Sequence, residues 1–267
     1  MALDAINFDT LILEKFLRVT GTDITTGEVQ FMFDNIKDGN IEGTEDTEYI
    51  TGANGVNLVA LARNKTCTVT FNRAFLSFST LSAQTGSPVS VASAQNKFKV
   101  PKVEIIKATS ATTASVSGTP IAGTLKYVYT LNDDGSLKDK FTLTTDSVTA
   151  GKFTLSGSNL TFAANALTSG QQILAVYDEE VTVGKKISNR ADTKAIYSYL
   201  IADLVCLDRC NNNTKYITRF IMPNAKVSGN FTIDVGNTDT AHAFSAEAMP
   251  AGCGVDPVYF DWYIVED

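Results

Sequence analysis

Few residues in this sequence are cysteines or histidines, whose side chains bind zinc and often act as nucleophiles or bases. Zinc sites take four cysteine or histidine ligands, usually in closely spaced pairs, and only Cys206 and Cys210 are near each other here. We therefore predict buried, unreactive thiols, no metal site and no cofactor. A contact between Cys210 and Cys253, and a metal site, are the alternatives. The sequence contains one histidine, His242, and four cysteines, Cys67, Cys206, Cys210 and Cys253.

Two runs of acidic residues are the remaining candidates for catalysis, one at residues 178–180 and one at Glu45 and Asp46. Hydrolysis of a glycosidic bond uses two carboxylates that face each other across a cleft, whereas both runs are typical of solvated strand ends or loops. His242 lies among alanines in an expected strand, which favours a structural role. The sequence also lacks the glycine-rich phosphate-binding motifs and the nucleophile-elbow motif. We therefore predict that the protein is not an enzyme.

The overall charge limits the partners that the chain can bind. Its 267 residues carry a net charge of −7, with a pI near 4.8. Binding to nucleic acid by neutralising phosphates needs clustered lysine and arginine, so we predict no such binding. An acidic wall past which DNA slides is compatible with this charge, and simple solubility is the alternative. We also expect no signal peptide and no apolar run of the roughly 20 residues that span a bilayer.

Residues 225–235 alternate strictly between apolar or small side chains and polar ones. Successive side chains of a strand point to opposite faces, so this pattern predicts a strand with one buried face and one wet face. The wet face must meet water, a partner or a lumen. Its polar side chains are Lys226, Ser228, Asn230, Thr232 and Asp234.

Other patterns predict further strands and one helix. Residues 28–36 read as a strand. Residues 195–207 form a nearly continuous apolar run that best fits a strand buried on both faces, with a helix as the alternative. Residues 74–84 carry apolar side chains at helical spacing, so we predict a helix whose aromatic residues cover a sheet. Residues 11–19 are compatible with a short helix or an arm. Residues 259–265 predict a last strand with Trp262 in the core.

Turn-forming residues indicate where the strands near the N-terminus end. Asp38-Gly39 predicts a hairpin turn, because both residues tolerate a positive φ. Residues 42–55 are acidic and interrupted by glycine, which predicts a long exposed loop. Residues 63–65 predict a turn between strands at 56–62 and 67–72.

The composition changes near residue 97 and again near residue 188. Between them, short strands recur at spacings of roughly 8–12 residues, as in a small sandwich or barrel. We predict an all-β protein, mainly antiparallel, with a β-sandwich or barrel core. The predicted core spans residues 1–96 and 189–267, with one flanking helix. Residues 97–188 form an inserted small β-sandwich-like module.

Four stretches together resemble the major tail tube proteins of tailed bacteriophages. The first is IEGTEDTEYITGANG at residues 41–55, followed by Asn64-Lys65 before a strand, and the second is FLSFSTLSAQTG at 75–86. The third is KISNRAD at 186–192, and the fourth is MPNAKVSGNFTID at 222–234, then TAHAFSAEA at 240–248. The resemblance covers residues 25–95 and 185–267, and the middle module fits it less well.

The resemblance implies a structural subunit that forms homohexameric rings, which stack into a hollow tube whose lumen conducts DNA. Its implied partners are identical subunits, other tail proteins such as sheath, terminator or baseplate proteins, and DNA in transient non-specific passage, with no membrane. The implied location is the virion tail, assembled in the host cytoplasm. A virion decoration protein or carbohydrate-binding β module is the alternative.

The resemblance also suggests roles for particular residues. The polar side chains of residues 225–235 become candidates for the lumen face. The exposed stretch becomes a candidate contact between subunits or rings, through Glu42, Glu45, Asp46, Glu48, Tyr49 and Ile50.

Overall fold

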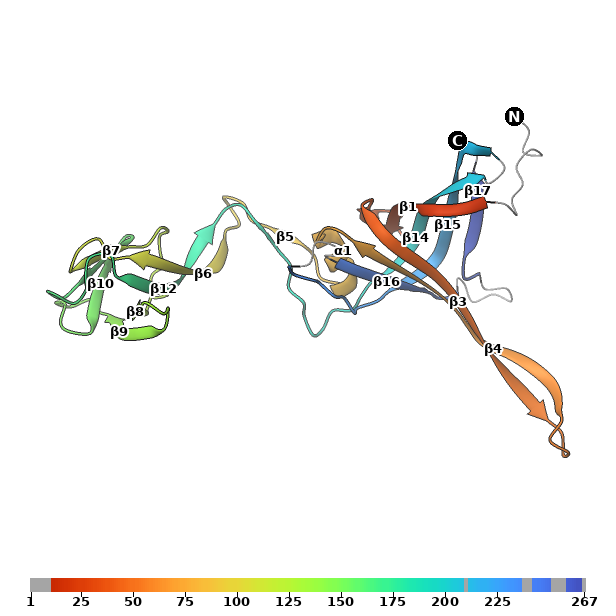
Figure 1. Ribbon diagram of the computed structural model, residues 1–267, viewed down its shortest axis with the longest axis horizontal. Coiled ribbons are helices and arrows are strands. Elements are labelled where there is room, and N and C mark those ends of the chain that lie inside the picture. Colours follow the sequence, from red (N-terminus) through yellow and green to blue (C-terminus); the bar gives the residue numbers. More distant parts are fainter. Residues whose placement is uncertain (1–10, 209–210, 237–241, 251–257, 266–267) are drawn as a thin grey trace. The chain divides into compact units, whose positions relative to one another are not determined.

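The computed structural model describes residues 11–208, 211–236, 242–250 and 258–265, and their secondary structure is almost entirely β (Figure 1). The chain divides into two compact units. Unit 1 lies within Met1–Val89 and Ile187–Asp267, and unit 2 is Ser90–Lys186. One α-helix occurs among the described residues. The predicted all-β, mainly antiparallel fold with one flanking helix is confirmed.

Unit 1 is built around one antiparallel, eight-stranded sheet. Its order is β2-β1-β14-β15-β16-β4-β3, and β17 also pairs with β15. Residues 11–19, for which a helix or an arm was the expectation, belong to a strand. The strands are β1 (Leu11–Thr22), β2 (Val29–Phe33), β3 (Ile36–Thr51), β4 (Asn57–Arg73), β14 (Tyr197–Asp208), β15 (Asn211–Val227), β16 (His242–Ala248) and β17 (Asp261–Val265).

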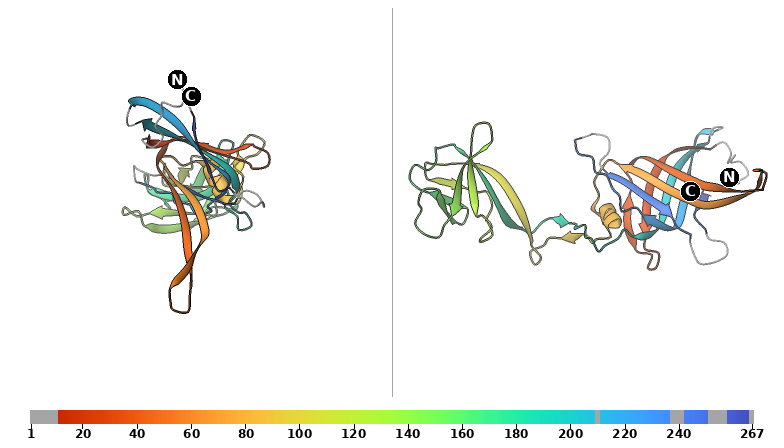
Figure 2. Two further views of the ribbon diagram at one scale, coloured as in Figure 1. Left: turned by 90° about the vertical axis from the view of Figure 1, so that its right-hand side faces the viewer. Right: turned by 90° about the horizontal axis from the view of Figure 1, so that it is seen from below.

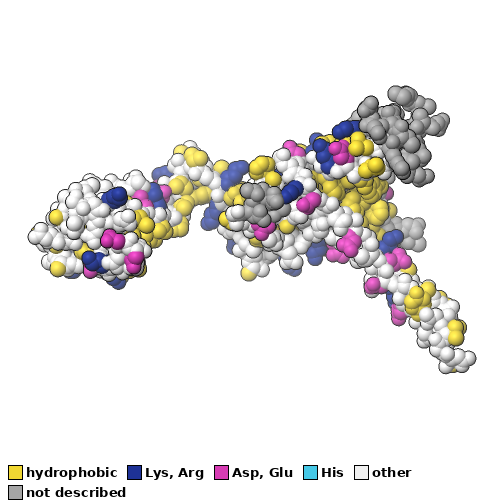
Figure 3. Space-filling model, in the orientation of Figure 1, with side chains coloured by type: hydrophobic (Ala, Val, Ile, Leu, Met, Phe, Trp, Pro, Cys, Tyr) yellow, Lys and Arg dark blue, Asp and Glu magenta, His cyan; other side chains and the backbone are white. Residues whose placement is uncertain are grey.

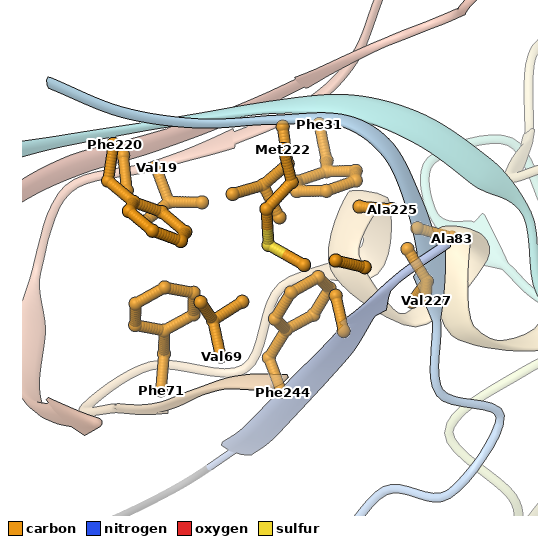
Figure 4. Close-up of a cluster of buried hydrophobic side chains, with 14 of the residues drawn as sticks. Val19, Phe31, Val69, Phe71, Ala83, Phe220, Met222, Ala225, Val227 and Phe244 are labelled. Carbon is orange, nitrogen blue, oxygen red and sulfur yellow. The ribbon is translucent and has the colours of Figure 1, made fainter. Parts of the chain in front are cut away.

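The sheet of unit 1 curves so strongly that its two ends share one core. Phe31 and Phe33 lie on the edge strand β2, and their rings meet residues near the opposite edge. The ring centroid of Phe31 is 5.3 Å from that of Phe244 on β16, and the ring centroid of Phe33 is 6.0 Å from that of Phe71 on β4. Figure 4 shows Phe31, Phe71 and Phe244 converging with Val69 and Met222 inside the curve. The core of unit 1 therefore forms only when strands distant in sequence come together.

Strand β14 is buried on both faces over much of its length, as predicted. Leu204 points into the core, and Asp203 on the other face is also buried. The Asp203 carboxylate lies 2.8 Å from the guanidinium groups of both Arg18 on β1 and Arg219 on β15. Burial alone would raise the pKa of Asp203, but the hydrogen bonds and charges of Arg219 and Arg18 outweigh it and hold the pKa low. This arrangement fixes the register of three neighbouring strands.

The helix α1 (Phe78–Thr85) begins four residues later than predicted and buries a different face. The Ser77 side chain caps it by accepting a hydrogen bond from the backbone N–H of Thr80, at 3.3 Å. Thr80, Ala83 and Gln84 are buried, whereas Phe75 lies outside the helix and is 61% exposed. The expectation that the aromatic residues cover the sheet is therefore wrong for Phe75, because the Ser77 cap starts the helix after it.

Two turns predicted near the N-terminus are also wrong. Strand β3 runs through Asp38 and Gly39 without turning. A Cβ atom at Gly39 would lie 2.6 Å from the Phe16 ring, so glycine provides space for an aromatic contact there rather than a turn. Strand β4 likewise runs through residues 63–65, where Asn64 takes a φ of 51° beside a shift in register. The turn-like residues mark a β-bulge, which accommodates an extra residue without ending the strand.

Unit 2 contains a seven-stranded sheet and a separate two-stranded one. The larger sheet has the order β6-β12-β8-β9-β10-β11-β7, and β9 and β10 pair in parallel. Its core includes Val128, Phe153, Leu160 and Ile173. The strands are β6 (Phe98–Lys107), β7 (Thr113–Ser115), β8 (Tyr127–Leu131), β9 (Leu137–Leu143), β10 (Lys152–Ser156), β11 (Asn159–Phe162) and β12 (Gln172–Val181), with β5 (Ser90–Val91) paired to β13 (Lys185–Lys186).

A buried tyrosine fixes one loop of unit 2 to its sheet. The Tyr177 hydroxyl donates to the Glu104 carboxylate at 2.7 Å and accepts from the backbone N–H of Gly118 at 3.1 Å. A Cβ atom at Gly118 would collide with a Glu179 carboxylate oxygen, so a larger residue there would displace the Glu179 side chain. Burial, followed by the hydrogen bond to Glu104, raises the pKa of Tyr177, so the hydroxyl keeps its proton at neutral pH.

Replacing Phe244 by alanine should strongly destabilise unit 1, because Phe244 is 2% exposed and its ring lies against those of Phe31, Phe33 and Phe71. We expect its free energy of unfolding to fall by about 3–5 kcal/mol. Urea unfolding followed by Trp262 fluorescence measures this, because the sequence has one tryptophan and it lies in unit 1. The exposed Phe75→Ala change is the matched control and should cost less than about 0.5 kcal/mol. Equal losses in the two variants would contradict the assigned core.

Candidate subunit interface

The distal parts of β3 and β4 form a hairpin that pairs with no other strand in the part of the chain that the structure describes. Residues 46–51 of β3 pair with residues 57–63 of β4, and the turn between them is closed by a hydrogen bond from Gly52 N–H to the Val56 carbonyl, at 2.8 Å. Gly55 in that turn has a φ of 73°. We call residues 44–66 the arm. Both views in Figure 2, together with Figure 1, show the arm extending beyond the sheet of unit 1.

Polar contacts across the arm set its register. The Thr44 and Thr66 hydroxyls are 2.7 Å apart, and the Asn64 amide donates to Asp46 at 3.2 Å. Arg63 pairs with Glu48 at 2.6 Å, with both side chains more than half exposed. An exposed ion pair contributes at most about 1 kcal/mol, and an isolated two-stranded hairpin is marginally stable in water. The arm therefore needs further contacts to be held rigidly.

The end of the arm carries large apolar side chains that the fold leaves in solvent. Ile50 lies opposite Val59 on one face, and Tyr49 lies opposite Ala60 on the other. Tyr49, Ile50, Val56, Leu58 and Val59, which we call the tip cluster, are between 48% and 66% exposed. Figure 3 shows hydrophobic side chains at the end of this hairpin, at the lower right. An exposed apolar group of this size marks a contact surface.

The acidic stretch predicted as a loop is therefore a strand. All six predicted contact residues, Glu42, Glu45, Asp46, Glu48, Tyr49 and Ile50, lie on β3 and are exposed. Sequence reasoning was wrong because the polar and glycine residues that suggest a loop are tolerated in a ribbon solvated on both faces. It also missed Val56, Leu58 and Val59 on the returning strand. Their alternation was visible in the sequence, but it was assigned to a separate pair of strands.

The predicted lumen strand ends earlier than the sequence pattern suggests. Strand β15 stops at Val227, and residues 228–236 are not a strand. The Ser228 hydroxyl accepts a hydrogen bond from the backbone N–H of Asn230 at 3.2 Å, a local contact that competes with sheet pairing. Phe231, Ile233 and Val235 are exposed, as are Asn230, Thr232 and Asp234. The alternation therefore does not separate a buried face from a wet one beyond Val227.

Two of the five predicted lumen residues share a polar cleft of about 790 Å³. Lys226 and Ser228 line it together with Glu247, which lies opposite Lys226 on β16. The Lys226 ammonium group lies 5.8 Å from the centre of the Tyr197 ring. Asn230, Thr232 and Asp234 do not line this cleft. The structure thus divides the predicted set into a cleft group and an exposed group.

A family model links these observations to known proteins, since the model of the YomU/Tube protein family matches residues 11–249. The chain belongs to this family. The match confirms the resemblance to phage tail tube proteins and identifies a structural rather than a catalytic family, with the virion tail as the indicated location. A search of curated proteins gives no match.

The described cysteines of this tube protein, and two of its candidate acidic residues, are buried or paired with lysine. Cys67 and Cys206 are buried and free, and burial raises the pKa of the Cys67 thiol. Cys210 and Cys253 lie outside the described residues. Glu179 and Glu180 pair with Lys102 and Lys97 at 3.0 and 2.9 Å. Among the described residues, no three His, Cys, Asp or Glu side chains are grouped to hold a metal ion, and no helix is long and apolar enough to cross a membrane.

His242 connects the helix to the sheet of the tube protein. Its Nε2 atom lies 2.7 Å from the Gln84 Oε1 atom of α1, and the Gln84 amide donates to the Ala243 carbonyl at 3.0 Å. The side chain is buried, and within the described part of the chain its Nδ1 atom has no hydrogen-bond partner. Burial, and then the nearby charge of Arg73, lower the pKa of His242. The folded protein therefore keeps this imidazole neutral.

This lowered pKa predicts a loss of stability in mild acid. Below the unfolded value near 6.5, the unfolded chain takes up a proton that the folded chain does not, so stability is full above that pH and declines below it. Because His242 is the only histidine, the His242→Gln variant should show a flatter profile between pH 7.5 and 5.5. Urea unfolding followed by Trp262 fluorescence gives both profiles. Parallel profiles would show that His242 is not held neutral.

Proposed function

We propose that this protein is the structural subunit of a phage tail tube, forming stacked homohexameric rings whose lumen conducts DNA. The arm is the main support for this proposal. It places five large apolar side chains in solvent on a hairpin with little stability of its own. Contact with other copies of the chain would bury these side chains and stabilise the hairpin. Ring closure and stacking supply such copies at every subunit.

The edges of the unit 1 sheet support assembly into a ring. Strand β2 lies at one end of the sheet and β3 at the other. Unpaired strand edges promote uncontrolled association unless they are covered, and a closed ring of subunits can pair the edge of each copy with that of the next. Such pairing would make one continuous wall around the bore.

The proposed lumen face keeps the five residues Lys226, Ser228, Asn230, Thr232 and Asp234. All but Ser228 are exposed, and Ser228 lies in the polar cleft with Lys226. The net charge of −7 supports a bore that does not retain DNA, because retention requires phosphate neutralisation by basic side chains. Glu45, Asp46 and Glu48 lie on the arm, and Glu42 lies just before it on β3. We assign all four to contacts between subunits or rings.

The remaining partners follow from the same arrangement. We assign residues 97–188 to an inserted module on the outside of the tube, and sheath, terminator or baseplate proteins to the outer surface and the tube ends. Assembly takes place in the host cytoplasm. A carbohydrate-binding role has less support, because the exposed ring of Tyr127 in unit 2 already has the Lys140 ammonium group 3.9 Å from its centre. That position occupies a face on which a sugar would stack.

Charging the tip cluster should prevent tube formation without unfolding the protein. In the double variant Ile50→Asp, Val59→Asp, two carboxylates would have to be buried unpaired in the contact, which is strongly unfavourable. We expect tubes or six-membered rings for the unaltered protein by negative-stain electron microscopy, and none for the variant. Val183→Asp, at a position 88% exposed in unit 2, is the control and should assemble normally. An unaltered protein that stays monomeric at high concentration would overturn the proposed function.

Adding positive charge to the proposed lumen face should make assembled tubes retain DNA. We expect the double variant Thr232→Lys, Asp234→Lys to form tubes that bind short duplex DNA at low salt and release it as salt rises. Co-sedimentation of the tubes with labelled DNA measures this, with tubes of the unaltered protein as the control. Failure to form tubes would place these residues in a subunit contact. Tubes of the variant that do not co-sediment with DNA would place them away from the bore.

A further inference from the structure

The turn at the end of the arm contains the one Asn-Gly pair in the sequence, Asn54-Gly55. An asparagine loses its side-chain amide when the backbone nitrogen of the next residue attacks the side-chain carbonyl carbon, and a side chain on that next residue hinders the approach. Gly55 has no side chain, and a Cβ atom placed there would meet no described atom within 4 Å. Residues 53–56 are exposed, so water reaches the reacting atoms. The arm therefore presents a site for spontaneous chemical modification.

Two hydrogen bonds protect this site while the hairpin is closed. The Gly55 N–H donates to the Gly52 carbonyl at 2.9 Å, and the Gly52 N–H donates to the Val56 carbonyl at 2.8 Å. A nitrogen held in a hydrogen bond keeps its proton and does not act as a nucleophile. An isolated hairpin is marginally stable in water, and exposed turns open locally at little cost in free energy. How often the arm opens therefore controls the reaction.

We propose that Asn54 is a deamidation site that limits how long an unassembled subunit stays competent for assembly. In the open turn the Gly55 nitrogen gives its proton to hydroxide and bonds to the Asn54 Cγ atom. The bond from Cγ to the amide nitrogen breaks, and that nitrogen takes a proton from water and leaves as ammonia. One water molecule then opens the cyclic imide at either carbonyl, which gives aspartate or isoaspartate. The reaction consumes only water and needs no oxidant or reductant.

Either product changes the surface that we assign to subunit contacts. Aspartate places a negative charge in the turn between Ile50 and Val56 of the tip cluster, and burying that charge in a contact is unfavourable. Isoaspartate adds a carbon atom to the backbone, which disturbs the hydrogen bonds that close the turn at Gly52. This effect on assembly rests on the proposed function. An arm covered by a neighbouring copy stays closed and keeps Asn54, whereas the arm of a free subunit loses it with time.

Peptide mass spectrometry of the full-length protein, stored at neutral pH and physiological temperature, measures the reaction directly. We expect Asn54 to deamidate about tenfold or more faster in free subunits than in tubes of the same age, and faster at higher pH. Asn132 is the internal control, because it lies in an exposed turn of unit 2 but precedes an aspartate, and it should stay intact. Asn54 that survives in the folded free subunit but reacts in urea would overturn the proposal. Equal rates in tubes and free subunits would contradict control by assembly.

Variants at Asn54 test the effect of the modification on assembly. Asn54→Asp reproduces one product and should raise the concentration needed for assembly by about threefold or more. Asn54→Gln stays neutral and forms a cyclic imide more slowly, so it should keep its competence for assembly on storage. Asn132→Asp adds the same charge in unit 2 and should assemble normally, and thermal melts check that each variant is folded. Assembly of folded Asn54→Asp at the normal concentration would contradict the proposed limit on assembly, whereas an unaltered protein that never assembles would contradict the proposed function itself.

Discussion

The contact between the two ends of the curved sheet is the interaction on which the rest of unit 1 depends. Phe31 and Phe33 on β2 pack against Phe71 and Phe244 near the other end, and this packing brings the sheet around its core. It also fixes the directions in which the two edge strands and the arm leave the core. The arm begins where β3 and β4 continue beyond the last residues that pack on this core.

That geometry leaves strand edges and apolar side chains of a single chain exposed to solvent. Within the described residues its sheet ends at the edge strands β2 and β3, its arm has exposed apolar side chains, and Trp262, which was predicted to lie in the core, is 41% exposed. Each of these is unfavourable for an isolated subunit, and identical neighbours can cover all of them together. Membership of the YomU/Tube protein family fits this physical picture, in which stability of the whole structure comes from assembly as well as from folding.

The sequence was informative where side-chain patterns reflect a core and less so where they reflect solvent or partners. The all-β class followed from short strands separated by turn residues, and the strand at Tyr197–Asp208, buried on both faces, followed from the nearly continuous apolar run at 195–207. Residues 42–55 were taken for a loop because a ribbon with both faces in water has no periodic signal to separate it from one. The strand predicted through residues 228–235 was wrong for the opposite reason. The alternation was present, but the Ser228 hydroxyl accepts the hydrogen bond of the Asn230 backbone N–H locally. An apolar groove between β1, the first residues of β3 and β17 could not be foreseen, since it joins residues such as Leu13 and Trp262 that only the curvature of the sheet brings together.

We interpret the arm as a surface that contacts other copies of the chain. A cryo-electron microscopy map of the assembled full-length protein tests it most directly. We expect hollow stacked rings of six subunits in which each arm lies against a neighbouring copy, with the tip cluster covered. A map in which the arms point into solvent, or pack only on their own subunit, would contradict it.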